Sequence, residues 1–93
     1  MIKSTGDAQT EKVLHRHFSR RLPGDIQQVA YRKLRMINNA HRLDDLRIPR
    51  ANRLEKLSGD RSGQYSIRIN DRWRVCFAWR DGDAYHVEIV DYH

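Results

Sequence analysis

Hydrophobic and polar residues alternate along the last third of the chain. The alternation has a period of two over residues 64–70, 72–80 and 84–90, which predicts three β-strands with one buried and one exposed face. The face expected to form the core carries Tyr65, Ile67, Ile69, Trp73, Val75, Phe77, Trp79, Tyr85, Val87 and Ile89. The opposite face carries Ser66, Arg68, Arg72, Arg74, Cys76, Ala78, Arg80, His86, Glu88 and Tyr92. Functional chemistry is therefore expected on this second face.

Turn lengths decide which residues of these strands lie opposite one another, because partners in a sheet point to the same side. A three-residue loop between the first two strands places Ile67 opposite Val75. A loop of the same length between the second and third strands, with Gly82 at a positive φ, places Trp79 opposite Tyr85. Both pairings keep core residues facing core residues.

The polar face is predicted to gather arginines. The first loop sets Arg68 directly opposite Arg74, a repulsion of roughly 1–3 kcal/mol unless another group compensates for it. Tyr92 is expected opposite Arg72 and diagonal to Arg74. Guanidinium groups beside a phenol suit the binding of a phosphate. The alternative interpretation is that the arginines only solvate the open side of a sheet with one buried face.

The N-terminal half shows helical periodicity instead. Thr10 is expected to cap a helix that reaches about Phe18. Asp25 and Gln28 resemble a capping box that opens a longer helix, which ends at residues 38–39. The apolar stripe of this second helix consists of Ile26, Val29, Ala30, Leu34 and Ile37.

Shorter elements complete the prediction: an edge strand at residues 2–4, a helical turn at 43–46, a strand at 53–57 and a loop at 58–63. Two glycines and an arginine in that loop allow a phosphate site made of backbone N–H groups, with a simple turn as the alternative. Helices that precede the sheet define an α+β fold, with two N-terminal helices packed on a small antiparallel sheet. The length predicts one domain over residues 1–93.

Composition adds a strong positive charge. The net charge is +6, and the excess is mostly arginine, with 14 Arg against 4 Lys. This charge fits an anionic polymer or an acidic protein partner and does not choose between them. Cys76 is the only cysteine, so no internal disulfide is expected. Without a signal-like or long apolar segment, the protein is expected to be soluble, cytoplasmic and away from membranes.

Metal, thiol and nucleotide chemistry are not predicted. His15 and His17 lie two residues apart and so point to different faces of a helix, and no cysteine stands at ligand spacing from any histidine. Cys76 lies mid-strand without an evident base. No Gly-rich nucleotide motif follows a strand, so neither a cofactor nor a metal is expected. A helix-turn-helix DNA reader is the alternative for the two helices, although the break at residues 23–24 differs from its short turn.

Short motifs spread over the whole chain, most densely from residue 53 onward, point to a family. They are Met1-Ile2-Lys3-Ser4, Leu54, Leu57-Ser58-Gly59-Asp60-Arg61, Gly63, Ser66-Ile67, Trp73-Arg74, Gly82-Asp83-Ala84-Tyr85 and Asp91-Tyr92-His93. In this combination the chain resembles the HigB toxins, also called plasmid maintenance killer proteins, a branch of the RelE-like toxin superfamily. The resemblance implies the same two-helix, antiparallel-sheet fold as the periodicity.

The resemblance also implies a function. HigB toxins belong to type II toxin–antitoxin systems and are ribosome-dependent mRNA endonucleases that cut in the A site. The implied partners are a helix-turn-helix antitoxin (HigA-like), the ribosome with its mRNA, and operator DNA indirectly through the antitoxin. Because such a nuclease acts inside the ribosome, five basic helix positions are candidates for docking on ribosomal RNA, with ordinary solvated helix faces as the alternative: Arg16, Arg20, Arg21, Arg32 and Arg35. The alternatives are a non-catalytic antitoxin-binding module and a small nucleic-acid-binding protein.

The site residues follow from the same resemblance. The catalytic positions correspond here to Arg74, Asp91, Tyr92 and His93. Where well-known members contribute a His and a Lys, this chain has Glu55 and Ser58, so the general base is left open. Substrate binding is expected from Glu55, Lys56, Arg61, Arg68 and Arg72.

These residues suggest a mechanism in which the RNA supplies its own nucleophile, the 2′-OH. Arg74, with help from Arg68 or Arg72, stabilises the charge on the phosphate. Tyr92 or His93 exchanges protons with the 2′-OH and the 5′-oxygen. Asp91 orients its neighbours, and the products are a 2′,3′-cyclic phosphate and a 5′-hydroxyl. Asp91 and His93 have the parity of the core face and Tyr92 that of the exposed face, so a twist or bulge is expected at the strand end. Replacing Arg74 by Ala is expected to lower cleavage on ribosomes sharply and to leave folding nearly intact.

Overall fold

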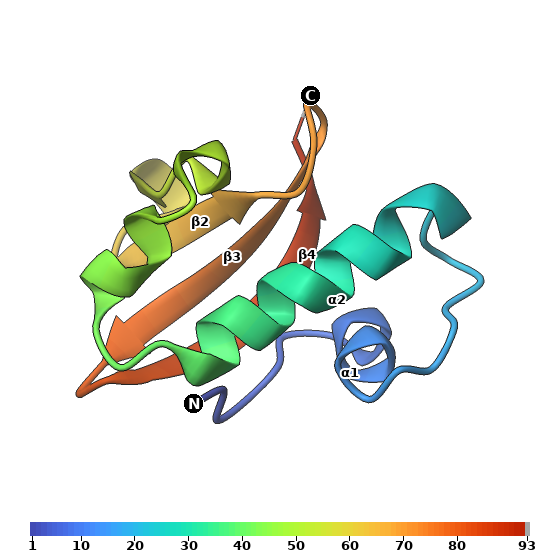
Figure 1. Ribbon diagram of the computed structural model, residues 1–93, viewed down its shortest axis with the longest axis horizontal. Coiled ribbons are helices and arrows are strands. Elements are labelled where there is room, and N and C mark those ends of the chain that lie inside the picture. Colours follow the sequence, from blue (N-terminus) through green and yellow to red (C-terminus); the bar gives the residue numbers. More distant parts are fainter. Residues whose placement is uncertain (93) are drawn as a thin grey trace.

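The structure is a computed structural model that describes residues 1–92; His93 lies outside the described residues. The elements are α1 (Ala8–Leu14), α2 (Gly24–Asn39), the short 3-10 helices η1 (Leu43–Arg47), η2 (Arg50–Asn52) and η3 (Gly59–Arg61), and strands β1 (Glu55–Lys56), β2 (Gln64–Arg68), β3 (Trp73–Arg80) and β4 (Asp83–Asp91). Helix α2 crosses one face of the sheet with α1 beside it (Figure 1). The α+β prediction is confirmed.

The sheet is an antiparallel meander in the order β1-β2-β3-β4. The predicted pairing of Ile67 with Val75 is confirmed, and with it the like-charge pair Arg68–Arg74. Strand β1 is shorter than predicted, because only two residues pair with β2. The N-terminal edge strand is reduced to two isolated parallel bridges, Ile2 to Ala84 and Thr5 to Val87.

The predicted register of the second hairpin is wrong. Its turn has two residues, Asp81 and Gly82, with φ of 52° and 83°, as the Asp-Gly type I′ turn requires. This shorter turn pairs Trp79 with Ala84 instead of Tyr85. Tyr85 therefore lies opposite Ala78 on the outer face of the sheet, away from the helices.

A bulge in β4 restores the predicted sides of the sheet beyond this point. The register shifts by one residue between Cys76 and Ala78 of β3, and His86 in the facing stretch of β4 has a φ of 54°. The extra residue returns Val87 and Ile89 to the core. The short turn and the bulge cancel each other. The alternation of residues 84–90 therefore looks the same as it would after a three-residue loop without a bulge.

Helix α1 starts earlier and ends sooner than predicted. Asp7 is its N-cap and accepts the amide of Thr10 at 2.7 Å. The Thr10 hydroxyl is buried instead and accepts the amide of Ile89 at 2.9 Å, which joins the helix to β4. The chain leaves the helix at Arg16, whose φ is 63°. Phe18, expected on the apolar side of the helix, is 68% exposed.

The predicted apolar stripe of helix α2 and its end at residues 38–39 are confirmed, but the predicted N-terminal cap is wrong. Pro23 is the N-cap and provides no side-chain bond, so the predicted Asp25–Gln28 capping box is absent. The Gln27 carboxamide orders the entry to the helix instead: it donates to the carbonyls of Ser19 and Leu22 and accepts the amide of Ser19. Hydrogen bonds from the Gln27 side chain to the preceding loop thus take the place of a side-chain cap at the N-terminus of the helix.

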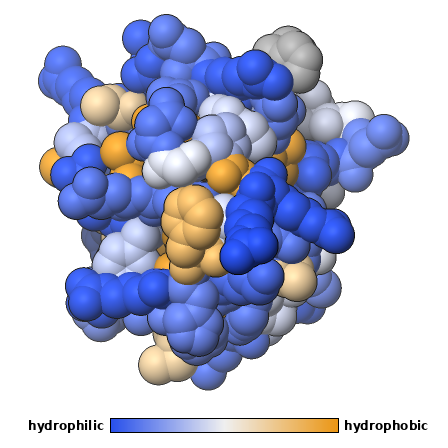
Figure 2. Space-filling model, turned by 90° about the vertical axis from the view of Figure 1, so that its right-hand side faces the viewer, coloured by the Kyte–Doolittle hydropathy of each residue, from blue (hydrophilic) through white to orange (hydrophobic). Residues whose placement is uncertain are grey.

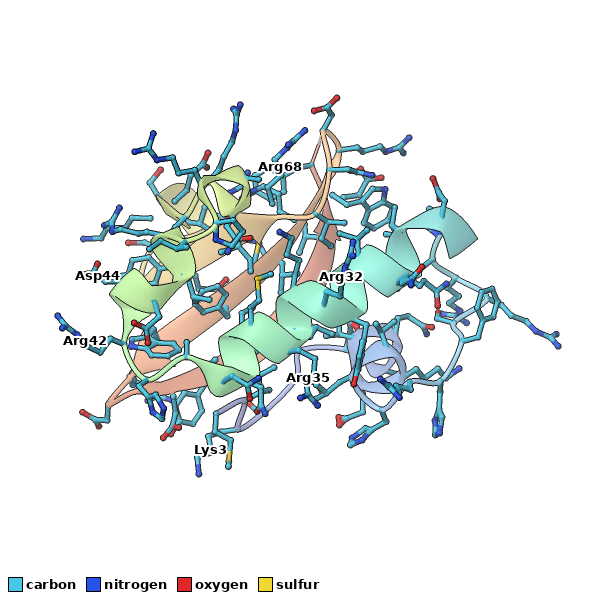
Figure 3. All side chains as sticks on the ribbon, viewed as in Figure 1. Lys3, Arg32, Arg35, Arg42, Asp44 and Arg68 are labelled. Atoms are coloured by element: carbon cyan, nitrogen blue, oxygen red, sulfur yellow. The ribbon has the colours of Figure 1, made fainter. Side chains whose placement is uncertain are left out.

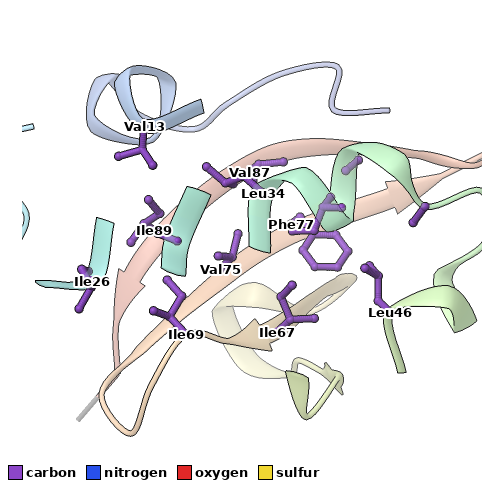
Figure 4. Close-up of a cluster of buried hydrophobic side chains, with 14 residues drawn as sticks. Val13, Ile26, Leu34, Leu46, Ile67, Ile69, Val75, Phe77, Val87 and Ile89 are labelled. Atoms are coloured by element: carbon purple, nitrogen blue, oxygen red, sulfur yellow. The ribbon is translucent and has the colours of Figure 1, made fainter. Parts of the chain in front are cut away.

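The core lies between α2 and the inner face of the sheet (Figure 4). It consists of Val13, Ile26, Ala30, Leu34, Ile37, Ala40, Leu46, Ile67, Ile69, Val75, Phe77, Ala84, Val87 and Ile89. Burial of this apolar surface provides the main driving force for folding. Within residues 1–92, no helix combines the length and apolar character that crossing a bilayer demands.

Candidate functional site

The centre of the outer face of the sheet is covered, contrary to the prediction of an exposed face, whereas Arg72, Arg80 and His86 on the same face are exposed. Ser66 and Cys76 are completely buried, and Arg74 is only 8% exposed. The cover comes in part from Arg61, whose Nη1 donates to Gln64 Oε1 at 3.0 Å and to Glu88 Oε1 at 3.1 Å. Since Gln64 opens β2 and Glu88 belongs to β4, the Arg61 guanidinium spans the sheet above β3.

Arg74 is the most firmly held polar group of this face. Its Nε donates to Ser66 Oγ at 2.7 Å, and its Nη2 donates to the carbonyl of Arg53 at 2.6 Å. Its Nη1 lies 3.9 Å from Glu55 Oε1, which is an ion pair but is too long for a hydrogen bond. The guanidinium is therefore fixed on two sides and presents its third nitrogen towards Glu55.

A pocket of about 260 Å³ lies beside Arg74 and Glu55. It is lined by Arg53, Glu55, Arg68, Asn70, Asp71, Arg74 and Tyr92. Arg68 pairs with Asp71, so carboxylates on both sides compensate for the repulsion between the two facing arginines. Arg68 projects from the end of β2 that lies towards the C-terminus, far from Asp44 and Arg42 (Figure 3).

Tyr92 brings a phenol to the same pocket. Its amide donates to the carbonyl of Arg72 at 2.5 Å, which confirms the predicted pairing at the strand end, and its side chain is 36% exposed. Burial raises the pKa of Tyr92, Cys76 adds to this effect, and the charges of Arg61 and Arg74 oppose it. The phenol is therefore protonated at neutral pH.

Cys76 lies beneath this layer and serves as packing. Burial raises the pKa of its thiol, although Arg61 and a hydrogen bond with Tyr92 counteract part of the increase. A buried thiol with a raised pKa is a poor nucleophile. Within the described residues, no group of three or more His, Cys, Asp or Glu side chains is arranged to hold a metal.

Two of the predicted site residues form a separate pair. Arg72 binds both oxygens of Asp91 at 2.8 Å, and neither residue lines the pocket. Lys56 is exposed on β1 and also lies outside the lining, and His93 lies outside the described residues. Of the predicted set, the pocket brings together Glu55, Arg68, Arg74 and Tyr92, the last of these directly after the Arg72–Asp91 pair.

Three residues of the lining were not predicted from the sequence: Arg53, Asn70 and Asp71. The Asn70 side chain accepts the amides of Arg72 and Trp73, a common role for Asn in a turn. The sequence predicts a turn at Asn70 and Asp71, but only the fold shows that this turn and Arg53 lie beside Arg74.

Comparison with known proteins gives a consistent family. The family described as "RelE-like toxin of type II toxin-antitoxin system HigB" matches residues 8–93. The chain is 43% identical over 65 residues to Toxin HigB-1 of Vibrio cholerae, which covers 70% of this chain and 68% of that protein. It is 44% identical over 41 residues to Endoribonuclease HigB of Proteus vulgaris, which covers 44% of this chain and 45% of that protein.

Solved structures show the same fold at low sequence identity. One is the YoeB–YefM complex from Staphylococcus aureus, with a TM-score of 0.61 and 19% identity over 100% of this chain and 98% of that chain. Another is YafQ from E. coli, with a TM-score of 0.60 and 14% identity over 98% of this chain and 91% of that chain. At these identities the likeness establishes the fold alone.

Proposed function

Because the chain belongs to the RelE-like toxins of type II toxin–antitoxin systems in the HigB family, we propose that it is an endoribonuclease that cuts messenger RNA in the ribosomal A site. The observation that carries this proposal is the pocket in which the Arg74 guanidinium faces Glu55 and Tyr92. A fixed cation, a carboxylate and a phenol in one pocket can supply the charge stabilisation and the proton transfers of RNA phosphodiester cleavage. The name of the Proteus vulgaris relative supports RNA cleavage.

Charge stabilisation is assigned to the arginines. The 2′-oxygen of the RNA attacks the adjacent phosphorus, and negative charge grows on the non-bridging oxygens. Arg74 is held by Ser66 and the Arg53 carbonyl, so it needs no reorganisation to donate from Nη1 to those oxygens. Arg68 provides the second cation from the facing strand.

Proton transfer is assigned to the residues on either side of Arg74. Glu55 accepts the proton of the 2′-OH while the bond from the 2′-oxygen to phosphorus forms. Tyr92, protonated at neutral pH, or His93, which follows it in the sequence, donates a proton to the 5′-oxygen as the phosphorus–oxygen bond breaks. The products are a 2′,3′-cyclic phosphate and a 5′-hydroxyl. The pairing of Asp91 with Arg72 anchors the strand end that carries Tyr92.

The proposal includes partners as well. A toxin of a type II system has an antitoxin, and we assign this one a helix-turn-helix antitoxin of the HigA type that links the toxin to operator DNA. The ribosome presents the message, and the arginine-rich surface, with a net charge of +6, supports docking on ribosomal RNA.

Primer extension on a translated message tests the proposal. The purified chain should produce cuts that depend on ribosomes and carry 5′-hydroxyl ends. Arg74→Lys keeps the charge but loses the fixed fork, and we expect cleavage to fall by about 10²–10³-fold, the usual effect of removing one preorganised donor.

The matched control is Arg47→Lys, an exposed arginine on η1, and cleavage by this variant should equal that of the wild type. Intact messages with wild-type protein contradict the proposal, and equal cutting of free RNA contradicts its ribosome requirement.

One observation favours the non-catalytic alternative. Glu55 places a carboxylate 3.9 Å from the guanidinium that is to bind phosphate, and like charges repel. A binding module would retain the antitoxin and leave messages whole, so the same primer-extension assay separates the two functions.

A further inference from the structure

Lys33 occupies an unusual position in the middle of α2. Its side chain is buried, and its Nζ donates to Asn52 Oδ1 at 2.6 Å. Its partner is therefore a neutral amide oxygen. Among the ion pairs of the described residues, none joins Lys33 to a carboxylate. Burial lowers the pKa of Lys33, and the charges of Arg32 and Arg68 lower it further. A buried cation with such a partner is costly, so its position calls for a reason beyond packing.

Asn52 also forms hydrogen bonds with residues of α2 and η1. It is completely buried, and its amide nitrogen donates to the carbonyl of Leu46 at 3.2 Å and to Met36 Sδ at 3.7 Å. The Asn52 side chain therefore fastens η2 to α2 on one side and to η1 on the other.

The residue after Asn52 touches the site itself. Arg53 is the C-cap of η2 and has a φ of 44°, a conformation that is uncommon for a residue with a side chain and that surrounding contacts must stabilise. In this conformation the Arg53 carbonyl accepts Nη2 of Arg74 at 2.6 Å, and the Arg53 side chain lines the pocket. A continuous series of contacts thus leads from Lys33 through the Asn52 backbone to Arg74.

We propose that Lys33 and Asn52 are positioning residues of the site: together they hold Arg53 in its left-handed conformation, so that its carbonyl fixes the guanidinium of Arg74 facing the pocket. Neither residue lines the pocket, and both act through Arg53. The consequence for cleavage rests on the proposed function, whereas the effect on the Arg74 side chain does not.

The side-chain Nε–Hε signal of Arg74 in ¹⁵N-labelled protein reports on the geometry directly. The signal is identified by its loss in Arg74→Lys. Lys33→Met keeps the length of the side chain and removes the donor, and it should shift or broaden this signal. Lys12→Met, an exposed lysine on α1, should leave it in place. An unchanged Arg74 signal in a folded Lys33→Met variant overturns the proposal.

Cleavage separates positioning from stability. We expect Lys33→Met to reduce the single-turnover rate roughly 10–100-fold at a nearly unchanged half-saturating ribosome concentration, as for a catalytic group displaced by a fraction of an ångström. The double variant Lys33→Met/Asn52→Leu replaces both partners with apolar side chains and should recover most of the melting temperature. Its rate should stay low.

A double variant whose rate recovers together with its melting temperature means that the pair is only structural, and this overturns the proposal. If Lys33→Met does not fold, the Arg74 signal and the cleavage rate are measured in the double variant instead. If wild-type protein leaves messages whole while the Arg74 signal still responds to Lys33, the proposed function fails and the positioning role stands.

Discussion

Arg74 shows at the scale of a single residue how burial changes the interpretation of a motif. The sequence placed it on an exposed face, and its replacement by Ala was expected to leave folding nearly intact. In the structure it is 8% exposed and bonded to Ser66 and to the Arg53 carbonyl. Truncation would leave both acceptors without their donor, at a cost of about 1–3 kcal/mol. Lysine is therefore the cleaner replacement at this position.

Glu55 is the second residue whose role the geometry sharpens. Its side chain is 55% exposed and ends 3.9 Å from Arg74. If it is the general base, Glu55→Gln should reduce the cleavage rate by about 10²–10⁴-fold. The free energy of unfolding should change by less than about 0.5 kcal/mol, as for other exposed substitutions. Single-turnover cleavage and urea denaturation measure the two effects.

Asp44→Asn is the matched control for Glu55→Gln, because it removes an exposed carboxylate on η1. It should leave the cleavage rate unchanged. A Glu55→Gln variant that cleaves at the wild-type rate would assign the base to another group, such as the imidazole of His93.

At the scale of an element, the bulge in β4 decides on which face of the sheet the side chain of Tyr92 lies. The two-residue turn at residues 81–82 places Tyr85 on the outer face, and the bulge at His86 inserts one residue. Glu88 and Tyr92 consequently lie on the outer face, opposite Cys76 and Arg72. Without the bulge, the phenol of Tyr92 would point to the helix side of the sheet, away from the pocket.

The contact between the N-terminal segment and β4 leads to a prediction for Gly6. A Cβ at this position would lie 2.4 Å from Glu88 Cγ, which is far inside van der Waals contact. Gly6→Ala should therefore displace Glu88 from Arg61 and reduce the free energy of unfolding by about 1–3 kcal/mol, as overpacking does. Urea denaturation measures the loss.

Glu88→Ala removes the obstructing side chain, so in that background Gly6→Ala should cost almost nothing, and the two substitutions should be strongly coupled. Additive effects of the two substitutions would show that the close approach at Gly6 is relieved by some other movement.

At the scale of the whole molecule, basic side chains also lie away from the pocket, on α2 and on the segment that follows α1. A hollow of about 460 Å³ beside the start of α2 is lined by Val13, Arg16, His17, Phe18, Gln27, Gln28, Tyr31 and Arg32. The side of the molecule on which it lies shows hydrophobic colour surrounded by hydrophilic side chains (Figure 2). Arg32 and Arg35 extend from the same helix (Figure 3). This surface fits the docking role predicted for the basic helix positions.

Salt dependence tests this docking role. The logarithm of the ribosome association constant should fall linearly with the logarithm of the salt concentration, because each phosphate contact releases counterions. Arg20→Gln/Arg21→Gln removes two exposed charges after α1 and should reduce the slope by about 1–2, roughly one for each lost contact. Sedimentation with ribosomes at several salt concentrations measures it. A slope equal to that of the wild type would place the contact surface elsewhere.

Local pattern determined much of this protein from its sequence alone. The period-two strands, the stripe of α2 and the α+β class follow from which residues must be buried, and the motifs of the last forty residues indicated the family and Arg74 with Tyr92. These features are local because periodicity expresses the geometry of one element. The Asp-Gly pair also predicts the second turn, but the alternation favours three turn residues where the structure has two.

Only the tertiary structure decided the bulge at His86, the burial of Arg74 and the path from Lys33 to Arg53. The path from Lys33 to Arg53 and the bond that fixes Arg74 depend on contacts between residues far apart in the chain, Lys33 with Asn52 and Arg53 with Arg74. The sequence pattern records which side of its own element a residue occupies. It does not record which distant backbone carbonyl that residue meets, because loop conformation and packing set that distance.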